Sequence, residues 1–448
     1  MRAPPNSAAE ALGAAAALRH NRAMTRARSA LPHLIFAVLI SVATARATAG
    51  LAEDMLLAAV TLACAEAPAA EMAAALPGGA QLLDDKPLAM GGVAFGWRRR
   101  FELEAGGRLR LTRLAPWDKL RRIEAEYAAV HDSGLRPEMI VVAGPDCRVH
   151  AARRLVYDAG RAEAIEILDA ALAPTGAREP LNPPLPTGRD PGGVTVALVD
   201  SGVNYLLPEI AARIARDESG RALGFDYWDL DERPFDANPS RSPFFPQRHG
   251  TRVASVILGE APDVRLIPYR YPRSDPARWA DLVADAAANG ARVVNMAMGS
   301  NRAEDWGDFV AAVEAQADIL FVVSAGNDDR NIDRRPVYPA AFNLDNMIVV
   351  TSADGFGRPA PGSNWGKGTV DLAVPGERIA VTDFHGNPAT ASGSSFAAPR
   401  VTALAARLLA ANPEWGATEL KAAIIARARM TDAGGPPTTR YGFLDPAQ

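Results

Sequence analysis

The sequence is poor in cysteine and in net charge, and it has no series of long apolar runs. Two cysteines among 448 residues exclude a small disulfide-rich fold and a four-cysteine zinc site. Lys and Arg number 48 against 52 Asp and Glu, so a net charge of −4 gives no reason to expect a nucleic-acid partner. The composition, 48% hydrophobic and 22% charged, is instead typical of a globular protein with about two or three domains.

Residues 1–49 are basic at first and end in small residues. Their apolar centre, residues 34–45, would rise only about 18 Å as a helix, short of the ~30 Å hydrocarbon core of a membrane. Residues 45–47 and 47–49 both fit an A-x-A cleavage pattern. These features predict a signal peptide, with Met24 as an alternative start, and therefore a secreted or periplasmic protein without a membrane span after cleavage. A retained anchor and a buried helix are the alternatives.

Residues 50–173 combine one helical pattern with several strand patterns. Residues 53–65 are apolar at helical spacing, and residues 96–114 alternate around a Gly-Gly pair, which is a hairpin signal. Residues 139–168 indicate two or three more strands. We expect a small α+β domain, and it carries no motif that we can attach to chemistry.

Both cysteines, Cys64 and Cys147, lie in this predicted domain. A disulfide between them is a reasonable expectation in an exported chain, because the compartment is oxidising and no other pair exists. The alternative is two small buried hydrophobic residues, since sequence does not show whether the Cα atoms lie within bonding range.

Residues 174–193 hold six prolines and four glycines, which predicts an extended linker. Beyond the linker, helical patterns at 276–290 and 302–317 alternate with unbroken apolar runs, as expected for strands buried on both faces of a parallel sheet. The sequence therefore predicts an α/β domain over residues 194–448. The apolar runs are residues 194–199, 264–269, 292–297, 319–324 and 347–352.

Two short glycine-containing motifs supply a carboxylate and an imidazole. Asp200 begins a DSG motif directly after the first apolar run, at the strand edge where sites form in parallel sheets. His249 begins an HGT motif, and the apolar residues that follow suit a helix packed on the sheet. Taken singly, Asp200 also fits a turn residue and His249 a structural histidine.

A serine and an asparagine complete the set of candidate residues. Ser395 lies in the segment GSSFAAP at the predicted start of a long apolar helix, where free backbone N–H groups favour developing negative charge. Asn327 follows a buried strand, and its amide could donate to an oxyanion. The simpler alternatives are a helix N-cap for Ser395 and a turn residue for Asn327.

The order Asp200, His249, Ser395 resembles the subtilases, the subtilisin-like serine peptidases. Asn327 lies between the histidine and the serine, where that family has its oxyanion-hole asparagine. The resemblance covers residues 193–448 and implies an α/β fold, a mainly parallel sheet with helices on both faces, preceded by the small α+β domain. Further segments that fit the family are residues 295–300, 363–366, 370–376 and 441–445.

The resemblance implies a serine endopeptidase that acts through an acyl-enzyme. Ser395 would be the nucleophile, His249 the general base and acid, and Asp200 the residue that orients the imidazole. Asn327 and the backbone N–H of Ser395 would stabilise the oxyanion.

The resemblance also implies where the substrate binds. Its backbone would add as a strand along Ala297, Met298 and Gly299, although Ala297 stands where the family usually has serine. Asp328 and Asp329 would lie near the primary specificity pocket, and our hypothesis is that they favour basic P1 residues.

No cofactor is required by this chemistry, and the expected partners are polypeptide substrates. Many subtilases bind calcium, and the acidic connection between Asp200 and His249 could bind it too, but its spacing matches no calcium loop that we recognise. We therefore favour a solvated acidic loop, with a structural calcium site as the alternative. The acidic residues are Asp226, Asp229, Asp231 and Asp236.

Two further questions stay open at this stage. The α+β domain lies where secreted subtilases carry a propeptide, and it could be such a segment or a permanent accessory domain. The chain could also be a catalytically inactive relative that binds peptides, or an esterase that uses the same triad. The sequence does not indicate an oligomeric state.

Overall fold

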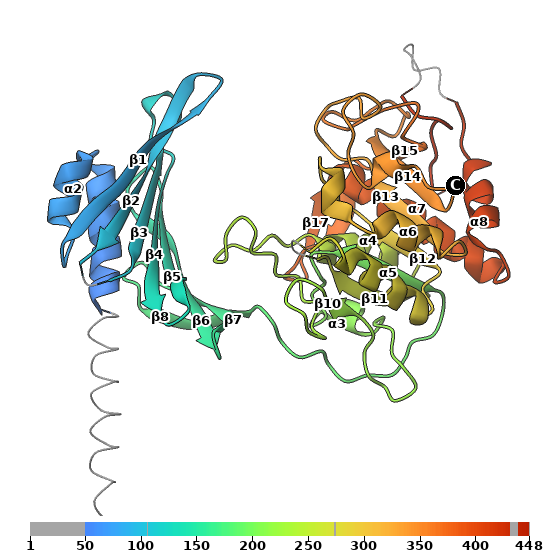
Figure 1. Ribbon diagram of the computed structural model, residues 1–448, viewed down its shortest axis with the longest axis horizontal. Helices are drawn as coiled ribbons and strands as arrows, with labels where there is room; N and C mark the ends of the chain where they lie inside the picture. The colour runs from blue at the N-terminus through green and yellow to red at the C-terminus, as the bar shows by residue number, and fades with distance from the viewer. Residues whose placement is uncertain (1–49, 105, 273–274, 431–437, 448) are drawn as a thin grey trace, which may run out of the picture. The chain divides into compact units, whose positions relative to one another are not determined.

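The computed structural model describes residues 50–104, 106–272, 275–430 and 438–447 (Figure 1). The predicted signal peptide lies outside the described residues. The chain divides into two compact units. The first unit runs to Leu155 and includes Glu166–Ala177, and the second comprises Val156–Ile165 and Arg178–Gln448.

A mainly antiparallel sheet of eight strands in chain order forms the frame of the N-terminal half. Helical residues 50–64 and helix α2 (Ala69–Ala75) pack apolar side chains such as Leu56 against strand residues such as Leu111. This is the α+β arrangement expected from the sequence. The strands are β1 (Ala80–Met90), β2 (Val93–Leu103), β3 (Arg108–Leu114), β4 (Arg122–His131), β5 (Gly134–Ala143), β6 (Val149–Asp158), β7 (Arg161–Leu168) and β8 (Pro174–Pro180).

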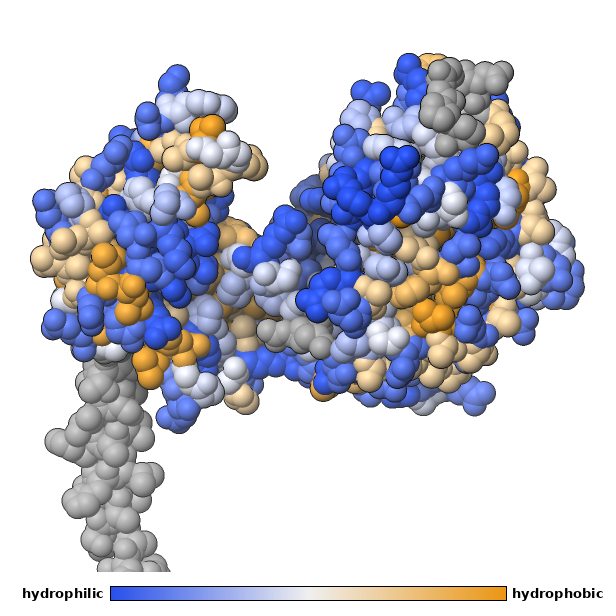
Figure 2. Space-filling model, turned by 45° about the horizontal axis from the view of Figure 1, so that its top comes forward, coloured by the Kyte–Doolittle hydropathy of each residue, from blue (hydrophilic) through white to orange (hydrophobic). Residues whose placement is uncertain are grey.

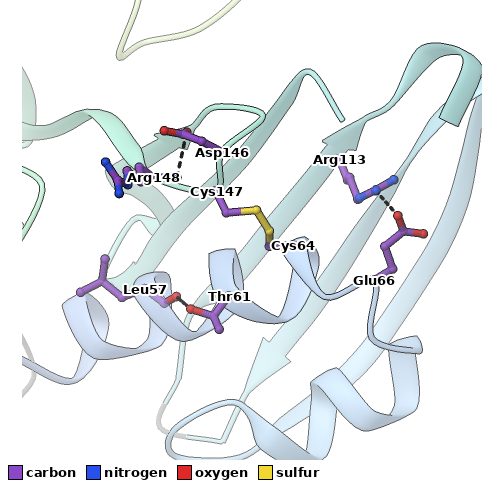
Figure 3. Close-up of a disulfide and its surroundings, with 8 residues drawn as sticks. All are labelled: Leu57, Thr61, Cys64, Glu66, Arg113, Asp146, Cys147 and Arg148. Atoms are coloured by element: carbon purple, nitrogen blue, oxygen red, sulfur yellow. Dashed lines mark hydrogen bonds and ion pairs between the residues drawn. A yellow bond between two sulfur atoms is a disulfide. The ribbon is translucent and has the colours of Figure 1, made fainter. Parts of the chain in front are cut away.

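A disulfide joins Cys64 and Cys147, whose Cα atoms are 6.0 Å apart (Figure 3). Cys64 ends the first described helix, and Cys147 lies in the turn between β5 and β6 with a left-handed φ of 63°. Beside it, Arg113 forms an ion pair with Glu66 just beyond the same helix. The disulfide therefore fastens the end of the helix to the sheet that it covers.

Strand β8 differs from the linker expected over residues 174–193. Its residues 174–180 form the last strand of the sheet, and only the remainder of the segment lacks helix and strand. The sheet tolerates its prolines because β8 is an edge strand, where one side of the backbone needs no partner.

The second unit is built on a seven-stranded sheet with the order β10-β11-β9-β12-β13-β14-β15, in which all the paired strands are parallel. The five predicted runs form its central strands, which confirms the expected α/β class. The strands are β9 (Thr195–Asp200), β10 (Phe225–Asp226), β11 (Arg265–Arg270), β12 (Val293–Met296), β13 (Leu320–Ser324), β14 (Met347–Ala353) and β15 (Leu372–Pro375).

Helices cover both faces of this sheet (Figure 1). Helices α4 (Gly250–Glu260), α7 (Ser394–Ala411) and α8 (Ala417–Ile425) share one core with alternate strand residues such as Val322. Helices α5 (Arg278–Ala288) and α6 (Phe309–Glu314) share the other core with the intervening residues such as Val323. The strands are apolar without interruption because the side chains on their two faces pack into the two different cores.

The smaller elements are η1 (Pro116–Asp118), α3 (Pro208–Ala211), η2 (Ala303–Trp306), η3 (Ala340–Phe342), β16 (Ile379–Thr382) and β17 (Pro388–Ala391). Figure 2 shows a mainly hydrophilic surface with scattered apolar patches on the face in view. Across the described residues, no helix has the length and apolar character needed to cross a membrane.

Candidate active site

The four predicted catalytic residues line one cleft of about 870 Å³ in the second unit. Asp200 is the last residue of β9, and Asn327 follows β13 at the same carboxyl edge of the parallel sheet. His249 directly precedes α4, and Ser395 lies in the first turn of α7. The N-terminal ends of α4 and α7 therefore place the imidazole and the hydroxyl in the same cleft as the carboxylate and the amide that follow the strands.

Asp200 and His249 are joined by a hydrogen bond in the cleft. Nδ1 of His249 lies 2.8 Å from Oδ1 and 2.9 Å from Oδ2 of Asp200. The backbone N–H of Ser201 donates to the same Oδ1 at 2.7 Å, which fixes the carboxylate. Because Nδ1–H of His249 donates to the Asp200 carboxylate, Nε2 of His249 is left as the basic nitrogen.

Burial and neighbouring charge shift the pKa of His249 in opposite directions. Burial lowers the imidazole pKa, but the charge of Asp200 and its hydrogen bond raise it, and the net pKa lies above the ordinary value. Gly250 permits the close approach, because a Cβ there would lie 2.0 Å from the Gly202 carbonyl oxygen and 3.0 Å from the Cβ of Asp200.

Ser395 stands at the N-terminus of the 18-residue helix α7. Its hydroxyl donates to the carbonyl of Ala297 at 3.2 Å, so it faces the strand predicted to bind the substrate. Free N–H groups in the first helical turn and the helix dipole favour negative charge beside this hydroxyl. The position suits an oxygen nucleophile.

Asn327 is held through its amide oxygen. Oδ1 of Asn327 accepts hydrogen bonds from the backbone N–H of Ser394 at 2.9 Å and from its hydroxyl at 3.1 Å. The Ser394 hydroxyl in turn accepts from the Gly326 N–H at 3.1 Å. With Oδ1 engaged, the Nδ2 group is the donor that remains for an oxyanion.

The sequence did not predict this contact of Ser394. The signal available was its position beside Ser395. Gly393, just before it, has a φ of 121°, and a Cβ there would lie 3.0–3.3 Å from the amide atoms of Asn327. Gly393 and Ser394 together set the place of the amide.

The predicted substrate strand borders the same cleft. Ala297, Met298 and Gly299 all line it, and Ser300 just beyond them exchanges backbone hydrogen bonds of 2.8 Å with Tyr338. Other residues that line the cleft were not predicted, because they come from segments without a motif. These include Asn238, Arg241, Tyr271, Trp279 and Trp306.

Asp328 is positioned differently from the other predicted binding residues. Its side chain is 56% exposed, lies 3.3 Å from Nη2 of Arg330, and is not among the described residues that line the cleft. Asp328 therefore forms an ion pair with Arg330. A preference for basic P1 residues stays a prediction.

The acidic connection before α4 is not the solvated loop that we expected. Asp226 and Asp236 are both buried, and Arg270 on β11 binds Asp226 at 2.8 Å and Asp229 at 2.7 Å. Asp231 accepts a hydrogen bond from Asn182 at 3.1 Å. The expectation was wrong because the groups that bind these carboxylates, such as Arg270 and Asn182, lie in other segments of the chain.

The question of calcium is separate from the burial of this loop. Within the described part of the chain, no group of three or more His, Cys, Asp or Glu side chains is arranged to hold a metal ion.

A parallel α/β sheet that gathers an aspartate, a histidine, a serine and an amide donor has the constellation of a serine hydrolase. The model of the subtilase family matches residues 192–443, which is more than half of the sequence. This chain belongs to the subtilase family.

The individual relatives share less than a third of their aligned residues with this chain. The chain is 28% identical over 230 residues to a thermophilic serine proteinase of Bacillus sp. (strain AK1), covering 48% of this chain and 52% of the relative. It is 30% identical over 260 residues to alkaline serine exoprotease A of Vibrio alginolyticus, covering 55% and 44%. It thus spans about half the length of these two relatives. A solved cold-adapted subtilisin-like serine proteinase is 26% identical, with a TM-score of 0.46, and the match covers 60% of this chain and 96% of that one.

Proposed function

We propose that this chain is an exported serine endopeptidase that hydrolyses polypeptides through Asp200, His249 and Ser395. The observation that carries the proposal is that the three side chains line one cleft, with the imidazole 2.8 Å from the carboxylate. Membership of the subtilase family supports the same chemistry. No feature of the cleft favours an inactive peptide-binding protein.

In the first half of the reaction, the Oγ of Ser395 bonds to the peptide carbonyl carbon. Its proton passes to Nε2 of His249, and Asp200 stabilises the imidazolium that forms. The imidazolium then gives this proton to the leaving amine as the carbon–nitrogen bond breaks. The product is an ester on Ser395.

In the second half, water attacks the ester and gives its proton to Nε2 of His249. The carbon–oxygen bond to Ser395 breaks, the serine oxygen takes the proton back, and the carboxylic acid product leaves. The same three residues therefore return to their starting states.

The oxyanion of each tetrahedral intermediate would be bound by Nδ2 of Asn327 and the backbone N–H of Ser395. Ser394 supports this assignment, because its two hydrogen bonds to Oδ1 orient the amide. Donors fixed before the reaction stabilise developing charge without reorganising. The substrate backbone would lie along Ala297, Met298 and Gly299 as an added strand.

Casein hydrolysis by the parent and by Ser395→Ala tests the activity. We expect hydrolysis by the parent and its loss in Ser395→Ala, while Ser219→Ala, which changes an exposed serine in a turn bonded to Asp217, retains it. Equal hydrolysis by parent and Ser395→Ala would contradict the proposal. Casein binding without cleavage by the parent would favour the peptide-binding alternative.

Export is tested by mass spectrometry of the protein recovered outside the cytoplasm. We expect a new N-terminus close to residues 45–50, at one of the two A-x-A patterns. An intact N-terminus at Met1 or Met24 would contradict the signal peptide. The same spectrum shows whether residues 50–190 remain attached, which decides between an accessory domain and a propeptide.

A further inference from the structure

Asp236 is a fully buried carboxylate next to the Asp200–His249 pair. It belongs to the long connection between β9 and α4, and neither its position in the sequence nor the proposed reaction gives it a role. Its Oδ1 accepts from the Ser201 hydroxyl at 2.6 Å and from the His249 backbone N–H at 3.2 Å. Its Oδ2 accepts from the Thr251 backbone N–H at 3.0 Å and from the Thr251 hydroxyl at 2.6 Å.

Ser201 connects this carboxylate to Asp200. Its backbone N–H donates to Oδ1 of Asp200, while its hydroxyl, which has one proton, is closest to Asp236 and accepts from the Gly250 N–H at 2.9 Å. Asp236 therefore contacts both segments that carry the reacting pair, the DSG turn and the start of α4.

The backbone around Asp236 is fixed independently. Arg270 on β11 donates to the carbonyl of Ala237 at 3.0 Å, and Arg248 donates to the carbonyl of Asp236 itself. Arg270 is paired in register with Asp200 across β11 and β9. The loop is thus anchored to the strand beside the catalytic carboxylate.

The hydrogen bonds around Asp236 fit its ionised form, although its burial opposes ionisation. Burial raises the pKa of this carboxyl above its ordinary value, and the hydroxyls of Ser201 and Thr251, the Thr251 N–H and the charge of Arg248 offset only part of that rise. Oxygens that accept from backbone N–H groups cannot donate to them, so these donors match a carboxylate. Its charge adds to that of Asp200 in raising the pKa of His249, and the charge of Arg252 opposes both.

We propose that Asp236 is a positioning residue of the catalytic triad, holding Asp200 and His249 in register through Ser201 and the His249 backbone. The inference rests on the proposed peptidase function for its kinetic consequence. A buried, hydrogen-bonded contact of this kind fixes the relative place of two reacting groups that come from different segments. Displacement by about 1 Å can cost about a hundredfold in rate.

Asp236→Asn tests the proposal, because it keeps the size of the side chain and removes its charge. We expect kcat to fall at least about tenfold with KM changed by less than about twofold. We also expect the acid limb of the kcat/KM profile to move to lower pH, since a less anionic site lowers the pKa of the imidazole that must be neutral to act. A purely structural role would not move that limb.

Asp229→Asn is the matched control in the same loop. It weakens an ion pair with Arg270 without touching Ser201, His249 or Thr251, so we expect kcat and the acid limb to match the parent. A folded Asp236→Asn protein with unchanged kcat, or with a lower kcat and an unmoved acid limb, would overturn the proposal. Should Asp236→Asn not fold, Ser201→Ala removes only the connecting hydroxyl, and an unchanged kcat there would overturn it.

Titration of the His249 imidazole by NMR separates this inference from the proposed function. Measured in a Ser395→Ala background, it needs no activity, and Asp236→Asn should lower the imidazole pKa while Asp229→Asn leaves it in place. If the parent shows no hydrolysis that depends on Ser395, the proposed peptidase function is refuted, and the role of Asp236 is not. An imidazole pKa insensitive to Asp236→Asn would refute the role of Asp236 alone.

Discussion

Replacing Asn327 by alanine should remove one oxyanion donor and little else from the cleft. Oδ1 of Asn327 is engaged by Ser394, so Nδ2 is the group that the substrate oxygen would lose. The loss of one such donor costs about 2.7–4 kcal/mol in subtilisin, a relative whose value we carry over. We therefore expect kcat on a chromogenic peptide to fall by about a hundred- to a thousandfold with KM nearly unchanged, because the donor acts only in the transition state.

Ser394→Ala should give a smaller loss by the same route. It removes the hydrogen bond from the hydroxyl to Oδ1 but keeps the one from the backbone N–H. One hydrogen bond that orients the Asn327 amide, worth about 1 kcal/mol, is therefore lost, and kcat should fall about fivefold. Asn387→Ala, in the exposed turn between β16 and β17, is the matched control and should retain full kcat. The reasoning would be refuted by an Asn327→Ala protein with kcat within about twofold of the parent, or one in which only KM changes.

Three further predictions follow from the structure. Replacing Cys64 and Cys147 by serine opens a covalent loop with a sequence separation of 83. The free energy of unfolding of the N-terminal unit, measured in urea, should therefore fall by about 4.5 kcal/mol. An unchanged urea midpoint would contradict this. Because Asp200 raises the pKa of His249, kcat/KM should fall on acidification with a midpoint above the ordinary imidazole value of about 6.5, and a midpoint below it would contradict the assignment. If Asp328 favours basic P1 residues, Asp328→Asn should lower kcat/KM for Arg-P1 peptides and spare Leu-P1 peptides, whereas equal kinetics of the parent on both would dispose of the preference.

Much of the second unit could be predicted because its strands and motifs are local signals. Unbroken apolar runs such as residues 319–324, separated by helical patterns, favour strands with both faces buried, and the polar residues that follow such strands lie at one edge of a parallel sheet. The pairing of Asp200 with His249 followed from the family resemblance, and the structure adds its geometry. The same resemblance placed Asn327 in the cleft.

The parts that were missed depend on contacts between distant segments. The acidic loop looks solvated in sequence because Arg270, which neutralises Asp226, comes from a different strand. Asp236 gains its position only when the loop folds against Ser201 and Thr251. Strand β8 was missed because prolines argue against strands in general, and sequence does not reveal that a strand will lie at an edge.

Covalent labelling of Ser395 is the decisive measurement for the proposed reaction. A fluorophosphonate probe reacts with a serine only when the oxygen is activated, so the recovered protein should carry one adduct, mapped by peptide mass spectrometry to the segment around residues 393–399. Labelling should disappear in Ser395→Ala and weaken in His249→Ala. A parent protein that takes no label, or that takes it equally well in Ser395→Ala, would contradict a triad built on Asp200, His249 and Ser395.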